Sequence, residues 1–319
     1  MEKLNPKKVP NEAFKKKLAK LYCRFNFLNL AYTMCVILWG AYVRSSGSGA
    51  GCGAHWPLCN GEMIPSSNRL QTLIEFTHRF SSGVSLTLVL CGWLISRKLG
   101  EKKSPIRRVA NLTLIAIILE ALLGAGLVLF KLVEFDQSIA RAISISLHLL
   151  NTLFLLASLV SLSFLSMDES AYATNDRDLV PKNRLFRATL LVFLFLGISG
   201  AIAALGDTLF KAPTLLEGMK QDLSVNAHFL IKLRVFHPLI ASLWIFLGFI
   251  WSQKLLLHPN LFKIRGIFLS LLVLQFFLGF LNWVLLAPTV LQLIHLGVAN
   301  LAFMAFFVSG LMWKKWVND

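Results

Sequence analysis

Four of the seven histidines in this chain lie within or at the edge of long apolar segments, two in each half: His78, His148, His237 and His295. An ionisable side chain is costly inside an apolar segment and is therefore a functional candidate. Two imidazoles that face each other across a helix bundle can take the two axial positions of an iron-containing macrocycle. The pattern predicts one haem site in each half of the chain. For any single histidine, the alternative is a hydrogen bond to a neighbouring helix.

The other three histidines, His55, His228 and His258, fall in expected loops. There we expect solvated or locally packed side chains. Zinc fits the four candidates less well than haem, because the acidic or thiolate ligands that would complete a tetrahedral site are missing nearby.

Carboxylates accompany the first pair of histidines. Glu75 precedes His78 by one helical turn, so the two share a face if that turn is helical. Glu75 could accept a proton, stabilise a cation or cap a helix N-terminus. Glu120 lies inside the third apolar segment, but its counterpart in the second half is Gln275, which cannot ionise. We therefore expect the two halves to differ in chemistry.

A glycine-rich loop at residues 40–61, "GAYVRSSGSGAGCGAHWPLCNG", contains Cys52 and Cys59. If the loop lies outside the cytoplasm, a disulfide can persist there; two free thiols are the alternative. Three further cysteines are expected to be small buried residues: Cys23, Cys35 and Cys91. No C-x-x-C-H motif occurs, so covalent haem attachment is not indicated.

The composition indicates an integral membrane protein. Of 319 residues, 56% are hydrophobic and 15% are charged, and the mean hydropathy is +0.65. The net charge of +16 could suggest a nucleic-acid partner, but the basic residues are grouped between apolar runs. We therefore expect the lipid bilayer, and no nucleic acid, as partner.

Apolar runs long enough to cross a bilayer predict an all-α protein with eight transmembrane helices. The predicted spans are 26–43, 79–96, 109–130, 142–166, 186–206, 235–252, 266–287 and 290–313. The basic leader of the first run extends to Arg24, so we interpret that run as a retained anchor.

Basic residues predict the orientation. With both termini inside, the inner segments hold 23 Lys and Arg residues and the outer segments hold 9. This asymmetry predicts an N-in, C-in topology with the cysteine loop outside. Because even-numbered helices then begin at the outer face, all four candidate histidines fall in the outer half of the membrane.

Two weak internal similarities predict a repeat. "LEALLGAGLVL" at 119–129 is similar to "LQFFLGFLNWVL" at 274–285, and "GAYVRSSGS" from Gly40 is similar to "GAIAALGDT" from Gly200. We expect two pseudo-symmetric four-helix bundles. The expected segments are a basic cytoplasmic tail at 1–25, bundles at 26–166 and 186–313 around a cytoplasmic linker at 167–185, and a tail at 314–319.

Together with the cysteine loop, three motifs resemble the haem A synthase family, membrane enzymes that convert haem O to haem A for terminal oxidases. The motifs are "EFTHR" around His78, "SLHLLN" around His148 and "LGFLNWVLLAPTVLQLIHLGVANLAF" around His295. The resemblance covers nearly the whole chain.

The resemblance implies that haem O binds as substrate between His78 and His148, with Glu75 essential. Haem b would bind through His237 and His295. A porphyrin methyl group would become a formyl group by successive oxidations that need dioxygen. The resemblance also implies a disulfide between the paired loop cysteines.

In this family the protein would lie in the bacterial cytoplasmic membrane, with its haem sites toward the outer face. Candidate partners are a haem O synthase, an electron donor and a second copy of the chain. Arg44 and Arg69 are candidates for pairing with haem propionates, with a solvated loop charge as the alternative for each.

Two other functional classes also use paired histidines. A dihaem b-type electron carrier linked to quinol would not need Glu75. A haem-binding transporter would release haem unchanged.

Overall fold

The computed structural model describes residues 12–173 and 180–317. Within these residues, eight helical spans are long and apolar enough to cross a membrane. Their helices are α1 (Glu12–Ser45), α2 (Leu70–Leu99), α3 (Pro105–Leu129), α4 (Ile139–Leu165), α5 (Arg184–Leu209), α7 (Phe229–Arg234) continued by α8 (Phe236–Leu255), α9 (Phe262–Val284) and α10 (Thr289–Val317). The described part of the chain contains no β-strand. The all-helical, eight-span prediction is confirmed for these residues.

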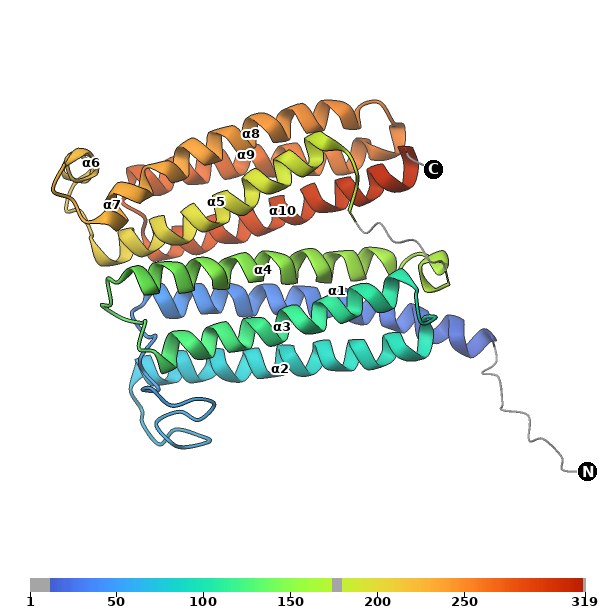
Figure 1. Cartoon of the computed structure of the whole chain (residues 1–319), viewed down its shortest axis with the longest axis horizontal. Coiled ribbons are helices and arrows are strands. Elements are labelled where there is room, and N and C mark those ends of the chain that lie inside the picture. The colour runs from blue at the N-terminus through green and yellow to red at the C-terminus, as the bar shows by residue number, and fades with distance from the viewer. Residues whose placement is uncertain (1–11, 174–179, 318–319) are drawn as a thin grey trace, which may run out of the picture.

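The helices form two groups of four that lie one above the other in Figure 1. We call α1–α4 the first group and α5, α8, α9 and α10 the second group. The groups meet where α4 packs on α5 and α10, and where α1 packs on α10. The start of α1 and the end of α10 lie at one end of the molecule, and α6 (Leu215–Leu223) lies at the other (Figure 1). We call the end with α6 the loop end, because residues 46–69 also lie there.

Helix boundaries follow local signals. Asn183 caps α5 by accepting from the amides of Leu185 and Phe186. Ser138 caps α4 by accepting from the amide of Arg141. The hydroxyl and amide of Ser138 also hold the pKa of the Asp136 carboxyl below its usual range, because both donate to it.

Several boundaries differ from the sequence prediction. Helix α2 begins at Leu70, nine residues before the predicted span, so Glu75 and His78 lie inside the helix. Hydropathy missed these first turns because they are polar. Helix α1 begins at Glu12, so helix extends into the predicted tail at 1–25, whose first eleven residues lie outside the described part. The short helices α6 and α7 were not predicted.

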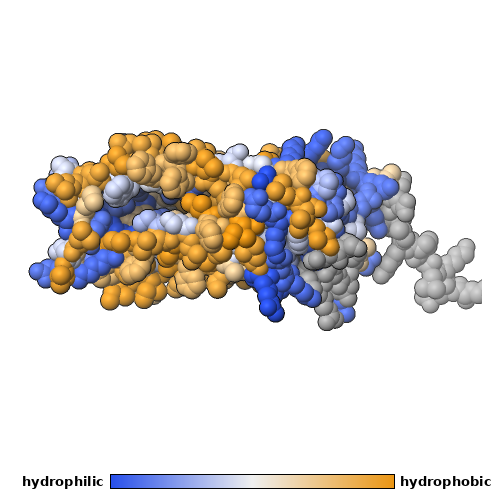
Figure 2. Space-filling model, turned by 90° about the horizontal axis from the view of Figure 1, so that it is seen from above, coloured by the Kyte–Doolittle hydropathy of each residue, from blue (hydrophilic) through white to orange (hydrophobic). Residues whose placement is uncertain are grey.

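The helices at the junction of the groups are the most buried. Burial differs over the most apolar 18 residues of each span. Half of these residues are buried in α4, but only 11% are buried in the span formed by α7 and α8 and in the span that contains α9. Figure 2 views the α8 and α9 side, which is largely apolar, as a lipid-facing surface should be. It is hollowed toward the loop end, where hydrophilic residues line the opening. Cys35 and Cys91 are exposed, so the prediction that they are buried is wrong.

Candidate functional site

Each candidate histidine lies against a glycine of the preceding long helix. A Cβ atom added to the glycine would lie close to the imidazole Cε1, at 2.8 Å for Gly40 and His78, 3.8 Å for Gly124 and His148, 3.0 Å for Gly200 and His237, and 3.3 Å for Gly279 and His295. The missing side chain therefore makes room for the imidazole. This contact occurs twice in each group of helices.

The second group brings His237 and His295 together, with their ring centroids 6.5 Å apart. With metal–nitrogen bonds of about 2 Å, two imidazoles on opposite sides of one metal have centroids roughly 6 Å apart. The surrounding groups are neutral: Ser199 Oγ lies 3.2 Å from His237 Nδ1, and Gln275 Nε2 lies 3.0 Å from His295 Nε2. This donor set fits a haem iron, provided that the Gln275 amide turns away from the ligating nitrogen.

In the first group, His78 of α2 and His148 of α4 each lie beside a glycine of the preceding helix. The Nδ1 atoms of both imidazoles are buried and have no hydrogen-bond partner among the described residues. His148 Nδ1 lies 3.5 Å from Glu120 Oε1, which is an ion-pair distance without hydrogen-bond geometry. Each pair of histidines named from the sequence therefore lies within one group.

Glu120 is fixed beside His148 by two residues of α4. Its carboxylate accepts from Asn151 Nδ2 at 2.6 Å and from Thr152 Oγ1 at 2.5 Å. Asn151 also donates to the Ala116 carbonyl oxygen at 2.9 Å. Sequence reasoning named Glu120 but missed Asn151 and Thr152. The available signal was their spacing of three and four residues from His148, which puts all three on one helix face.

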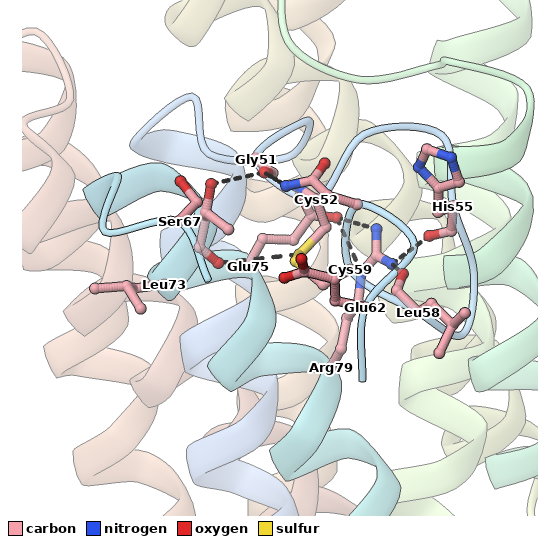
Figure 3. The surroundings of a disulfide bond; sticks show 12 residues. Gly51, Cys52, His55, Leu58, Cys59, Glu62, Ser67, Leu73, Glu75 and Arg79 are labelled. Atoms are coloured by element: carbon pink, nitrogen blue, oxygen red, sulfur yellow. Dashed lines mark hydrogen bonds and ion pairs between the residues drawn. A yellow bond between two sulfur atoms is a disulfide. The ribbon is translucent and has the colours of Figure 1, made fainter. Parts of the chain in front are cut away.

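Glu75 is 3% exposed and points toward the cysteine loop (Figure 3). It accepts from the Cys52 amide at 2.7 Å, and from Arg79 Nε and an Arg79 terminal nitrogen at 3.1 and 2.5 Å. Because α2 begins at Leu70, Glu75 lies in the second turn. It binds the loop rather than the free amides at the start of α2, so the interpretation as a cap of α2 is wrong.

Arg79 ties the loop to α2. It donates to the carbonyl oxygens of His55 and Leu58 while it pairs with Glu75 (Figure 3). Within the loop, Cys52 and Cys59 form a disulfide. Arg79 was not named as a site residue from the sequence, although its position four residues after Glu75 is an ion-pair spacing on a helix.

The loop also packs directly on the first turn of α2. The Thr72 hydroxyl donates to the Gly51 carbonyl oxygen at 2.8 Å. A Cβ on Gly51 would lie 2.4 Å from the Gln71 carbonyl oxygen, so only glycine fits there. The amide that holds Glu75 belongs to the next residue, Cys52, and so its position depends on this contact.

Arg44 connects the two groups. It donates to the Ala204 carbonyl oxygen at 2.7 Å, to Thr208 Oγ1 at 2.9 Å and to Gln292 Oε1 at 3.1 Å. The interpretation of Arg44 as a solvated loop charge is therefore wrong. Arg69 is exposed and fits that interpretation.

The second group has the opposite charge at the position of Glu75. Arg234 precedes His237 by three residues, as Glu75 precedes His78. It pairs with Asp222 at 2.6 Å and with Asp207 at 3.2 Å. No carboxylate contact to His237 or His295 is found among the described residues.

These features define a class: an eight-span membrane protein with two histidines in each group of four helices, of which only the first group has a carboxylate beside a histidine, Glu120 at His148. The family model COX15-CtaA, cytochrome oxidase assembly protein, matches residues 23–307. The chain belongs to this family.

Named relatives fall into two kinds. The heme A synthase of Staphylococcus carnosus is 30% identical over 230 residues, covering 69% of this chain and 70% of that protein. The heme A synthase of Bacillus mycoides is 35% identical over 127 residues, 40% of each chain. A protoheme IX farnesyltransferase of Thermus thermophilus is 41% identical over 281 residues, covering 87% of this chain but 46% of that protein. This chain therefore spans about half the length of its Thermus relative.

Proposed function

We propose that this protein is a haem A synthase, which oxidises a methyl group of haem O to a formyl group for use in terminal oxidases. The observation that carries the proposal is the asymmetry between the histidine pairs. Both pairs suit haem iron, but only the first is accompanied by carboxylates, the buried Glu75 and the half-buried Glu120. Similarity to the heme A synthases of two bacteria supports it.

In this proposal His78 and His148 bind the iron of haem O, the substrate, and His237 and His295 bind the iron of haem b. Haem b would supply electron transfer. The glycine beside each imidazole leaves room for the ring close to the neighbouring helix. The contacts of Ser199 and Gln275 with the second pair are neutral, and the Ser199 contact at His237 Nδ1 leaves Nε2 of that imidazole available to a metal.

Glu75 is the candidate catalytic carboxylate. Near the oxidised carbon it can hold a proton or stabilise developing positive charge. Two groups hold its carboxylate: the amide of Cys52, which is part of the loop, and Arg79, which binds a loop carbonyl oxygen. The loop therefore fixes the position of the Glu75 carboxylate. The Cys52–Cys59 bridge limits the freedom of the loop glycines. Glu120, whose Oε1 lies 3.5 Å from His148 Nδ1, would orient the His148 imidazole.

We also propose that the two groups are structural repeats, with both termini in the cytoplasm and the loop end outside the bacterial cytoplasmic membrane. The matching glycine–histidine contacts support the repeat. The excess of Lys and Arg in the segments assigned to the inner side supports the orientation. Both haem sites then lie toward the outer face.

A farnesyltransferase is the partner that we propose for substrate delivery. The Thermus relative is named for farnesyl transfer to protohaem IX, and this chain matches less than half of it. Addition of a farnesyl group is the step expected to make haem O, so a separate enzyme of that class would supply this protein's substrate. Dioxygen and an electron donor complete the proposed reaction, and a second copy of the chain is a further candidate partner.

Pigment analysis tests the function. The protein is produced with a haem O synthase in cells that lack haem A, and membrane haems are extracted and separated. We expect haem A from the wild type and none from Glu75→Ala. Haem b alone would indicate the electron carrier, and unchanged haem O that is passed to an acceptor would indicate the transporter.

A further inference from the structure

One face of α1 is polar and buried, although neither histidine site uses it. Tyr22, Asn26, Asn29 and Thr33 are 1%, 1%, 3% and 2% exposed. Their spacing of four, three and four residues places them on one helix face. Buried polar side chains in a membrane-spanning helix are costly and commonly mark a pathway for ions or protons.

This face meets small or polar residues of α2 in a constant antiparallel register. From the start of α1 toward the loop end, the neighbours are Tyr22 with Ser96, Asn26 with Gly92, Thr33 with Ser85, and Gly40 with His78. Each step along α1 matches an equal step back along α2. The polar layers therefore lead from the helix end opposite the loop to the first candidate haem site.

Several polar atoms in this interface have no protein partner. The Tyr22 hydroxyl lies near Asn26 and Ser96, but neither approach has hydrogen-bond geometry, and both amide atoms of Asn26 are likewise buried without a geometric hydrogen bond among the described residues. A buried amide left without a hydrogen-bond partner is costly, so a native structure normally pairs it with protein or with water. A Cβ on Gly92 would lie 3.1 Å from the Phe25 ring and 3.9 Å from Asn26 Oδ1, so glycine lets both side chains approach α2 closely. Water is the ligand that can pair with a phenol, an amide and a hydroxyl in one narrow space.

Nearer the site, hydroxyl groups continue the path. Thr33 Oγ1 and Ser85 Oγ are 2.9 Å apart. From Ser85 to His78 the helix rises by about 10 Å. Ser81 and Ser82 lie in this interval and donate to the His78 carbonyl oxygen at 3.0 and 2.8 Å.

The second group fills the matching positions with aromatic rings. Positions in the two groups are matched by counting seven and fourteen residues back from Gly40 and Gly200, and forward from His78 and His237. Asn26 then corresponds to Phe186, Thr33 to Phe193, Ser85 to Trp244 and Gly92 to Trp251. All four aromatic residues are buried.

These rings pack on each other across the same interface. The ring centroids of Phe186 and Trp251 are 5.3 Å apart, and those of Phe193 and Trp244 are 4.8 Å apart. A helix pair with this register thus packs mainly through aromatic rings; its polar atoms include the indole nitrogen of Trp244, which is buried without a partner among the described residues, and that of Trp251, which donates to Ser309. The polar layers of the first group are not a requirement of the fold.

We propose that the α1–α2 interface holds a file of water molecules that conducts protons from the Tyr22 end of the first group to the His78 site. A proton enters from bulk water near Tyr22, passes by hydrogen-bond exchange along the waters and the Thr33 and Ser85 hydroxyls, and leaves to water beside His78. The side chains end unchanged. The proposal rests on the proposed function, because dioxygen chemistry that forms water takes up protons.

Thiol labelling tests for water in the interface and needs no haem. In a background where the three free cysteines are serine, Asn29→Cys and Thr33→Cys are compared with Thr189→Cys. Thr189 is the matched control, because it occupies the position of Asn29 in α5, is fully buried and donates only to Leu185. A small, water-soluble methanethiosulfonate reacts with thiolate, which forms in water far more readily than in an apolar interior.

We expect the two α1 cysteines to react at least about tenfold faster than Thr189→Cys, because thiolate forms where water is present. Equal rates for all three variants would overturn the proposal. If the protein forms no haem A but the α1 cysteines still react about tenfold faster than Thr189→Cys, the proposed function is refuted and the presence of water in the interface is supported. The two failures are therefore distinguishable.

Turnover tests for proton delivery. Asn26→Leu combined with Thr33→Val should slow haem A formation about tenfold, less than the roughly hundredfold or larger loss when a general acid or base is removed, because these groups do not touch the reacting atoms. Thr189→Val and Thr33→Ser, which keeps the hydroxyl, should leave the rate unchanged. Haem b content and the thermal unfolding midpoint separate this loss from misfolding. Haem A formation at the wild-type rate in the double variant would overturn the proposal.

Discussion

The first and second groups of helices position their histidines in the same way but surround them with different chemistry. In the first group a carboxylate, Glu120, contacts His148; in the second an amide, Gln275, contacts His295. A carboxylate changes charge when it gains a proton, and an amide does not. A shared scaffold can thus support one site that handles protons and another that keeps a constant charge.

The residues that support these contacts differ in the same sense. Asn151 and Thr152 fix Glu120, whereas the residues three and four positions after His295 are Val298 and Ala299. The second group therefore lacks the polar groups that would stabilise an acid. The difference extends beyond the single exchange of Glu for Gln.

Near the loop end, the residues three positions before His78 and His237 have opposite charges. Glu75 is paired with a cation on its own helix, and the matching Arg234 is paired with two anions. Each charge is neutralised locally, as groups near an apolar region require. Only the first arrangement has an acid three residues before the histidine.

The largest expected effect comes from removing the histidines one at a time. His78→Ala or His148→Ala should abolish haem A while the haem b spectrum remains, because one imidazole cannot hold the substrate iron on both sides. His237→Ala or His295→Ala should instead remove the haem b spectrum. Difference spectra and extracted haems measure both. Loss of haem b in all four variants would contradict the assignment of the two histidine pairs to two separate haem sites.

Glu75→Gln should lower the rate of haem A formation by about a hundredfold or more, within the range for loss of an acid–base group. The amide can still contact Cys52 and Arg79, so the loop should stay in place. Glu62→Gln is the matched control, since Glu62 directly follows the cysteine loop and is exposed, and among the described residues its carboxylate accepts only from Ser66. An active Glu75→Gln protein would favour the electron-carrier interpretation.

How much the sequence reveals depends on the kind of signal. Eight spans follow from hydropathy, and the histidine pairs follow from their matching places. The role of Arg79 does not, because its partners are backbone carbonyls of a loop whose path no local pattern specifies. The polar face of α1 was missed because averaging over a window hides Asn26, Asn29 and Thr33 among apolar neighbours.

Adding a methyl group at the glycines should affect one site at a time. Gly40→Ala would place a Cβ 2.8 Å from His78, and Gly200→Ala one 3.0 Å from His237, so each imidazole must shift. A displacement near 1 Å can cost about a hundredfold in rate, and we expect roughly thirtyfold for Gly40→Ala. Gly200→Ala should lower haem b content instead.

Gly124→Ala is the control for this pair, because its Cβ would make an ordinary 3.8 Å contact with His148. It should retain most activity. If Gly124→Ala were as damaging as Gly40→Ala, helix packing rather than imidazole position would explain the loss.

The smallest expected effect comes from exchanging the residues that distinguish the two sites. Glu120→Gln gives the first site the neighbour of the second and should slow haem A formation about tenfold, as expected for a group that orients a metal ligand. Gln275→Glu does the reverse and places a carboxylate beside His295. A negative charge near the haem stabilises its oxidised form, so the midpoint potential of haem b should fall. Redox titration of the haem b band measures this shift, which a purely structural role for residue 275 would not produce. An unchanged potential with full haem b content would show that Gln275 does not contact His295 when haem is bound.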